Sequence, residues 1–313
     1  MTFRYLDYEA SRQVPNIVVD GSPNESSVLA LSHWPGVAAP PGLARDLSAE
    51  MAFAYLDTPV EHPRADVVTN NHFDQDGIVS IHALIEPESS LAHRELLIDV
   101  AAAGDFATYR DRRAARASMV LSRFAEADNE CEYDEFTDQL YTELLPQLMT
   151  IVLDNDRHRE LWADEDDQLT ASEQAIASGA VTIDEHPDAD LAVITIAHDQ
   201  PVRSGHRFGG QSFEGLHPMA INNATGRFRL LIVHGRRYRY IDRYETWVQF
   251  QSHPVLARVD MRPLAEQLTA QETSTTTWSA GSLDSLSPEL SHDGESSIVA
   301  DALQQLVIDQ LRV

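Results

Sequence analysis

The feature that most constrains the fold is a segment in which an apolar strand, a polar loop and a helix follow one another. Val67 and Val68 end an apolar run, and the loop at residues 70–77 carries one histidine and two aspartates. Residues 78–85 then have the composition of a helix, which Pro87 stops. This order is typical of a parallel α/β sheet, in which the loop lies at the carboxyl end of the strand.

The loop itself predicts a metal site. In extended backbone, residues two apart point the same way, so His72, Asp74 and Asp76 are expected to converge. Two neighbouring carboxylates repel each other, and a bound cation relieves that repulsion. Carboxylate oxygens with an imidazole suit Mn²⁺, Mg²⁺ or Fe²⁺. The alternative is a solvated turn that caps the helix, with Gly77 allowing the sharp turn.

The rest of the chain fits an α/β fold made of a mostly parallel sheet with flanking helices. Strands are expected at residues 16–20, 27–31, 65–69 and 191–196, and a helix at 43–56. Apolar residues recur at helical spacing between about 106 and 180, which predicts a helical insert. We therefore expect an α/β domain over residues 1–200 that holds the metal site.

A smaller α+β domain is expected over residues 201–313. Residues 228–233 and 238–250 predict a β-hairpin. Residues 273–297 are rich in serine and threonine and predict a loop, whereas residues 298–311 predict an amphipathic helix.

Composition excludes several classes of function. The 313-residue chain has a formal net charge of −27, and all 23 of its basic residues are arginine, so lysine-dependent phosphate and Schiff-base chemistry is excluded. Cys131 is its single cysteine, which excludes a thiolate zinc cluster within the chain. We expect a cytoplasmic protein that binds neither a membrane nor duplex nucleic acid, whose phosphates an acidic surface repels. A homodimer is left open.

Three further residues are candidate metal ligands because each follows a strand or an apolar run. They are His33, Asp99 and His198. In a parallel sheet the carboxyl ends of strands face one crevice, so these side chains are expected to meet the loop at residues 70–77. Each also has an ordinary interpretation as a turn, surface or helix-capping residue.

The string His72-x-Asp74-x-Asp76-Gly77-x-x-Ser80 resembles the first motif of the DHH phosphoesterases. The resemblance implies a centre of two Mn²⁺ ions, or of Mg²⁺ or Fe²⁺, with Asp76 and Asp99 as catalytic residues and one of them bridging the ions. It implies hydrolysis of a small phosphorylated metabolite or short nucleotide. The Asp-His-His motif of that family is missing, and His33 and His198 are the substitutes to consider.

Two alternatives remain beside that resemblance. The string Phe73-Asp74-Gln75-Asp76-Gly77 is also similar to the aspartyl-phosphate motif of haloacid-dehalogenase-type phosphatases, with Asp74 as nucleophile and Asp76 as acid. The other is a non-catalytic protein that binds a metal or a nucleotide.

Candidate substrate-binding residues lie in the C-terminal third of the chain. Guanidinium groups match phosphate oxygens, and a glycine-rich loop can hold an anion through its N–H groups. The candidates are His206, Arg207, Arg236, Arg237, Arg239 and Arg243. The alternative is an ordinary surface hairpin whose arginines pair with the surrounding acids.

Overall fold

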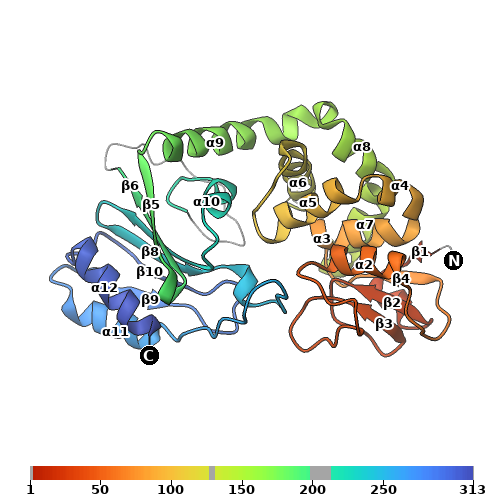
Figure 1. Ribbon diagram of the computed structural model, residues 1–313, viewed down its shortest axis with the longest axis horizontal. Helices are drawn as coiled ribbons and strands as arrows, with labels where there is room; N and C mark the ends of the chain where they lie inside the picture. Colours follow the sequence, from red (N-terminus) through yellow and green to blue (C-terminus); the bar gives the residue numbers. More distant parts are fainter. Residues whose placement is uncertain (1–2, 127–130, 198–212, 313) are drawn as a thin grey trace. The chain divides into compact units, whose positions relative to one another are not determined.

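A computed structural model describes residues 3–126, 131–197 and 213–312. The chain forms two compact units (Figure 1). Unit 1 comprises Met1–Asp164 and Val248–Pro254, and unit 2 comprises Glu165–Trp247 and Val255–Val313. The division lies earlier in the chain than the expected residue 200, because the strand at residues 191–196 pairs with a strand of unit 2.

Unit 1 is built on a parallel four-stranded sheet with the order β1-β4-β2-β3. Its strands are β1 (Arg4–Tyr5), β2 (Asn16–Val19), β3 (Ser27–Leu31) and β4 (Val67–Thr69). The strands expected at 16–20, 27–31 and 65–69 are therefore confirmed. Both central strands, β2 and β4, are buried along their whole length, as expected of apolar strands covered on both faces.

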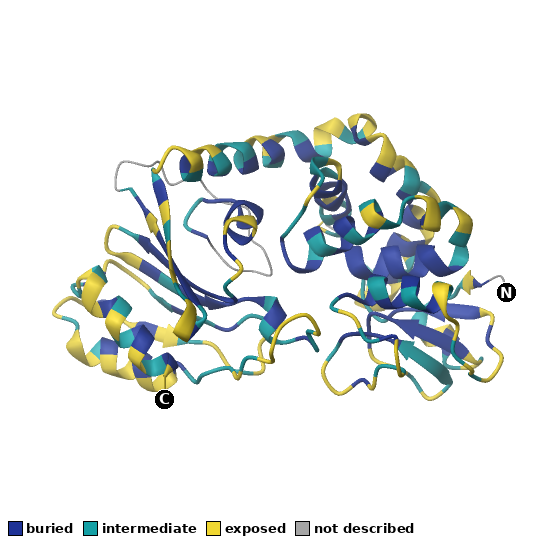
Figure 2. Ribbon diagram, in the orientation of Figure 1, coloured by how far each residue is buried: buried dark blue, intermediate teal, exposed yellow. Residues whose placement is uncertain are grey.

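Helices cover this sheet. They are α1 (Tyr8–Ser11), α2 (Ser48–Asp57), α3 (Gln75–Ile85), α4 (Pro87–Ala92), α5 (Arg94–Asp105), α6 (Arg112–Ala125), α7 (Tyr133–Leu144) and α8 (Leu148–Leu153). Helix α3 packs against both α2 and α5 and is buried from Gln75 to Leu84 (Figure 2). This explains why its sequence is apolar on nearly every face.

Residues 106–180 are largely helical, as expected, but they do not form a single insert within one unit. Helices α6 to α8 belong to unit 1, whereas the division between the units falls within α9 (Arg159–Ala177). Residues 106–180 therefore complete unit 1 and then lead into unit 2.

Unit 2 contains a six-stranded, mostly antiparallel sheet with the order β5-β6-β7-β8-β10-β9. Its strands are β5 (Val181–His186), β6 (Leu191–Ile196), β7 (Arg229–His234), β8 (Arg237–Asp242), β9 (Trp278–Ala280) and β10 (Glu289–His292). Its helices are α10 (Pro218–Ala224), α11 (Arg262–Gln271) and α12 (Ala300–Leu311). The β7–β8 pair confirms the expected β-hairpin, and α12 confirms the expected C-terminal helix.

The serine- and threonine-rich residues 273–297 are not the loop that composition predicts. They contain β9 and β10, which pair with each other, while β10 also pairs with β8. Trp278 and Leu290 are buried in the core of unit 2. Each of these strands thus contributes one large buried side chain to the core, although the surrounding sequence is rich in serine and threonine.

Among the described residues, no helix is both long and apolar enough to span a membrane.

Candidate metal centre

Acidic and histidine side chains meet where the strands of unit 1 end. Asp20 directly follows β2, and His33 follows β3. The loop that carries His72 follows β4, which pairs directly with β2 in parallel register. Asp20 is fully buried with a left-handed backbone (φ 46°), a conformation that aspartate tolerates better than most residues. The parallel sheet therefore brings together residues far apart in the sequence.

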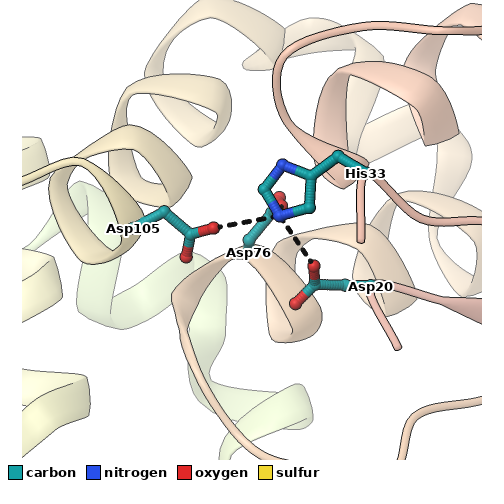
Figure 3. Close-up of side chains that lie close together, drawn as sticks. All are labelled: Asp20, His33, Asp76 and Asp105. Atoms are coloured by element: carbon teal, nitrogen blue, oxygen red, sulfur yellow. Dashed lines mark ion pairs between the residues drawn. The ribbon is translucent and has the colours of Figure 1, made fainter. Parts of the chain in front are cut away.

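Four buried side chains form what we call the inner group: Asp20, His33, Asp76 and Asp105 (Figure 3). Each offers one ligand atom, and these atoms all lie within 4.8 Å of one another. His33 Nε2 lies 3.4 Å from Asp20 Oδ1 and 3.4 Å from Asp105 Oδ2. It lies 3.9 Å from Asp76 Oδ2. Three carboxylates thus surround one imidazole nitrogen.

The outer group consists of Asp20, His72 and Asp74, and it is less buried. His72 Nε2 lies 2.8 Å from Asp74 Oδ2 and 3.4 Å from Asp20 Oδ2. Asp20 belongs to both groups, because its Oδ1 faces His33 while its Oδ2 faces His72. Asp20 Oδ2 is buried and accepts no hydrogen bond from any residue that the structure describes. One carboxylate therefore joins the two groups.

The orientation of His33 is fixed by its second nitrogen. Nδ1 lies 2.5 Å from the carbonyl oxygen of Asp46. A carbonyl oxygen only accepts hydrogen bonds, so Nδ1 must carry the proton. Nε2 is then the nitrogen that faces the three carboxylates, and a metal-ligating histidine commonly has its other nitrogen held by a carbonyl oxygen in this way.

Asp76 is held by the first turn of α2. Its Oδ2 accepts a hydrogen bond from the backbone N–H of Ser48 and its Oδ1 one from Ala49, each at 2.7 Å. The N–H groups at a helix N-terminus favour a negative charge. The Ser48 hydroxyl also donates to Asp20 Oδ1 at 2.9 Å, so α2 anchors two of the carboxylates.

The loop before α3 is anchored by Tyr141, which is fully buried on α7. Its hydroxyl donates to the carbonyl oxygen of His72 at 2.7 Å and accepts from Asn70 Nδ2 at 3.1 Å. Gly77 lies inside α3 without a positive φ, so the sharp turn is not why it is needed. A Cβ atom there would instead collide with Asn70 Nδ2 and the Tyr141 hydroxyl. Asp74 caps α3 by accepting from the Gly77 N–H at 2.8 Å.

Burial and mutual repulsion govern the acidity of these side chains. Burial, together with the charges of Asp74 and Asp76, raises the pKa of Asp20 well above its ordinary value. Burial likewise raises the pKa of Asp76. Burial would also raise the pKa of Asp74, but the adjacent His72 outweighs it and lowers that pKa to about 2. Conversely, burial opposes a charge on His72, yet Asp74 and Asp20 raise its pKa.

The cluster can hold a metal ion. Carboxylates buried at this spacing repel one another when ionised, and a bound cation relieves that repulsion. The shared carboxylate Asp20 also has a buried oxygen directed at the outer group. Carboxylate oxygens with one imidazole per group suit hard or borderline divalent cations. The donor set present therefore fits the class of metal that the sequence predicts.

Asp99 was expected to be a metal ligand, but it is in neither group of the cluster. It lies on α5, and its carboxylate accepts hydrogen bonds from the backbone N–H groups of Arg110 and Asp111. These bonds tie the turn between α5 and α6 to the helix that ends at Asp105. Asp99 therefore supports the loop after the cluster, and the carboxylate that lies between the two groups is that of Asp20 rather than that of Asp76 or Asp99.

Three other expected residues lie outside the described part of the chain, namely His198, His206 and Arg207.

The arginines at residues 236–243 are placed as the ordinary interpretation expects. Arg239 Nη1 lies 2.8 Å from Glu289, and Arg243 is buried in an ion pair with Glu245. Arg236 donates to the carbonyl oxygen of Ser297 at 3.3 Å, whereas Arg237 is exposed at the start of β8. Arg239 and Arg243 are thus paired with carboxylates of unit 2.

Sequence reasoning missed Asp20 and Asp105. Asp20 had a usable signal, because it ends the apolar strand at residues 16–19 just as the loop at 70–77 ends β4. Asp105 had none, since it is the last residue of α5 and only packing brings that helix end to the cluster.

Comparison with known proteins places the chain in a family. It belongs to the family described as "Family of unknown function (DUF6687)", whose sequence model matches residues 1–312. No curated protein and no solved structure matches the chain.

Proposed function

We propose that this protein is a metal-dependent phosphoester hydrolase whose centre binds two divalent cations, Mn²⁺ being the first candidate. The inner group would hold one ion and the outer group the other. The observation that carries the proposal is the placement of Asp20, whose two carboxylate oxygens face different groups. A carboxylate in that position is suited to bridge a pair of ions.

Divalent cations, when bound, lower the pKa of a water molecule and polarise a phosphoryl oxygen. The chain's own residues supply the rest. Burial of the inner group keeps bulk water from His33 and the three carboxylates. The first turn of α2 holds Asp76, and the Asp46 carbonyl oxygen fixes the tautomer of His33. The less buried outer group, with His72 and Asp74, is the side accessible to a substrate.

The resemblance of residues 72–80 to the first motif of the DHH phosphoesterases supports this proposal. The histidine and both aspartates of that motif, His72, Asp74 and Asp76, belong to the cluster. His33 and Asp105, which also belong to the cluster, would supply donors in place of the missing Asp-His-His motif. A small phosphorylated metabolite or a short nucleotide is the proposed substrate class.

The aspartyl-phosphate alternative is less compatible with the geometry. It needs Asp76 as a mobile general acid close to substrate. Both oxygens of Asp76 instead accept backbone hydrogen bonds from α2, and the side chain is fully buried. A carboxylate fixed in this way is suited to hold a cation rather than to exchange a proton with a substrate.

The test is hydrolysis of a phosphoester panel by the full chain, stripped of metal and then supplied with Mn²⁺. The panel contains a phosphomonoester, a phosphodiester and short dinucleotides. We expect Mn²⁺-dependent turnover that Asp20→Asn lowers on the order of 100-fold or more. The matched control is Asp156→Asn, because the Asp156 side chain is 80% exposed. This variant should leave turnover unchanged.

Turnover without metal, or full activity of Asp20→Asn, would contradict the proposal. Tight Mn²⁺ binding without turnover of any panel member would overturn the hydrolase and leave a metal-binding protein.

A further inference from the structure

One segment of unit 1 comes from a distant part of the sequence. Val248–Pro254 belongs to unit 1, although the chain on both sides of it belongs to unit 2. We call this segment the strap. Its first residue, Val248, is buried, and the following residues contact the loops that carry the inner group.

Gln249 binds the loop that contains His33 at three points. Its backbone N–H donates to the carbonyl oxygen of His33 at 2.8 Å. Its side-chain Nε2 donates to the carbonyl oxygens of Trp34 at 2.6 Å and of Val37 at 2.8 Å. One side-chain amide thus closes the loop immediately after His33.

The strap also holds Asp46, the residue that fixes the His33 ring. Asp46 Oδ1 accepts hydrogen bonds from the backbone N–H groups of Gln251 at 2.5 Å and Ser252 at 2.9 Å. The carbonyl oxygen of the same Asp46 accepts from His33 Nδ1. In Figure 3 this nitrogen lies on the side of the ring away from Asp20 and Asp105. Both the backbone and the ring of His33 are therefore supported from the strap.

A third contact reaches the end of α5. The ring of Phe250 packs edge-on against Phe106, with 5.4 Å between the ring centroids. Phe106 directly follows Asp105, and its ring centroid lies 6.3 Å from that of His33. The strap therefore contacts the neighbours of two members of the inner group.

We propose that the strap is the supporting shell of the inner group and that Gln249 is a positioning residue for His33. This inference rests on the proposed metal centre. Partners that orient metal ligands commonly change metal affinity 10–100-fold when they are lost. The donated N–H groups of Gln249 matter most, because they face two carbonyl oxygens that only accept hydrogen bonds.

The test compares Mn²⁺ affinity by calorimetry in full-length, metal-stripped variants. Gln249→Glu keeps the shape of the side chain but replaces the N–H donors by an oxygen that repels both carbonyls. We expect Mn²⁺ affinity to fall about 10-fold or more. Gln13→Glu is the matched control: it makes the same change at an exposed residue of unit 1 that lies outside the strap. It should bind Mn²⁺ within about twofold of the wild type.

A spectroscopic measurement separates positioning from a general loss of stability. In a His72→Asn background, His33 is the only histidine of the two groups, so nitrogen coupling to bound Mn²⁺ in pulsed electron paramagnetic resonance reports His33 alone. We expect Gln249→Glu to weaken or abolish this coupling at saturating Mn²⁺. If Gln249→Glu does not fold, Gln249→Ala, which lacks the added charge, takes its place.

The outcomes separate the two proposals. If the wild type does not bind Mn²⁺, both the metal centre and the inference fall. If the wild type binds but the Gln249 variants show unchanged affinity and unchanged nitrogen coupling, the strap has no positioning role while the metal centre stands. Neither the Mn²⁺ affinity nor the nitrogen coupling depends on turnover. The test therefore remains valid even if the protein hydrolyses no phosphoester.

Discussion

At the scale of single residues, Asp20 is the side chain on which the site depends most. It is fully buried, its carboxylate faces both histidines, and Asp74 and Asp76 help to raise its pKa. Without a cation, such a residue opposes folding, because its charge is buried among like charges. Its presence makes sense when a ligand of opposite charge compensates for that cost.

Asp20→Asn should therefore stabilise the metal-free protein and abolish its response to metal. Asparagine keeps the shape and can still accept the hydrogen bond from Ser48, but it removes one buried negative charge. We expect a gain of about 1–3 kcal/mol in unfolding free energy, measured by urea unfolding with a chelator present.

With Mn²⁺ at about 100 times its Kd, the wild type should gain roughly 2.7 kcal/mol for each ion that it binds, and Asp20→Asn much less. The exposed substitution Asp156→Asn should change neither value by more than about 0.5 kcal/mol. Lower stability of metal-free Asp20→Asn would show that repulsion does not dominate at this residue.

The sequence predicts part of this site for a clear reason. His33, His72, Asp74 and Asp76 all follow strands, and alternation with apolar runs makes those strand ends visible. Asp105 ends a helix, and nothing in its local sequence distinguishes it from the many solvated aspartates of an acidic chain. Asp99 follows an apolar run and was therefore a candidate ligand. Its position on α5 instead directs its carboxylate to the backbone N–H groups of Arg110 and Asp111, between α5 and α6.

At the scale of elements, the segment β4–loop–α3 was predictable because its pattern is local. An apolar strand, a polar loop and an apolar helix require no knowledge of the rest of the chain. Strands β9 and β10 were not predictable, because they are short and lie in a stretch that is rich in serine and threonine. They exist because β8 offers an edge to pair with and because Trp278 and Leu290 are buried in the core.

Glu272, which follows α11, holds this part of unit 2 together and makes its stability depend on pH. Burial opposes its charge, but hydrogen bonds from Ser296, Ser297 and Trp278 outweigh burial and lower its pKa to about 2. The folded pKa is below the ordinary value of 4.5, so the charged form favours folding. This stabilisation is complete above about pH 4.5 and is lost as the pH falls towards 2.

Glu272→Gln should lower the unfolding free energy by about 1–2 kcal/mol at pH 7, an estimate reduced for partial exposure. The difference from the wild type should shrink as the pH falls from 4.5 to 3, as followed by denaturant unfolding with tryptophan fluorescence. Glu295→Gln is the control, because Glu295 is exposed. A difference that stays constant over this pH range would refute the assignment.

At the scale of the whole molecule, the chain returns to unit 1 after it has built part of unit 2. Local sequence patterns do not predict this return, since they favour one continuous strand over residues 238–250, which includes the first residues of the strap. Strand β8 ends at Asp242, and residues 248–254 instead bind the loops around His33. Such a return is decided by contacts between residues about 200 positions apart, such as Gln249 with Trp34, which local patterns do not encode.

The net charge of −27 determines what a metal-binding experiment on this protein must measure. An acidic protein attracts divalent cations to its surface, so weak binding by itself says little about the cluster. A specific centre must bind a fixed number of ions, and that number must depend on the residues of the inner and outer groups.

The most direct test counts the Mn²⁺ ions that the full-length protein retains after desalting, by native mass spectrometry. We expect two ions for the wild type, one for His72→Asn, which leaves the inner group intact, and none for Asp20→Asn, which alters both groups. Asp156→Asn should retain two. A wild type that retains no ion, or an Asp20→Asn variant that retains as many as the wild type, would contradict the central claim.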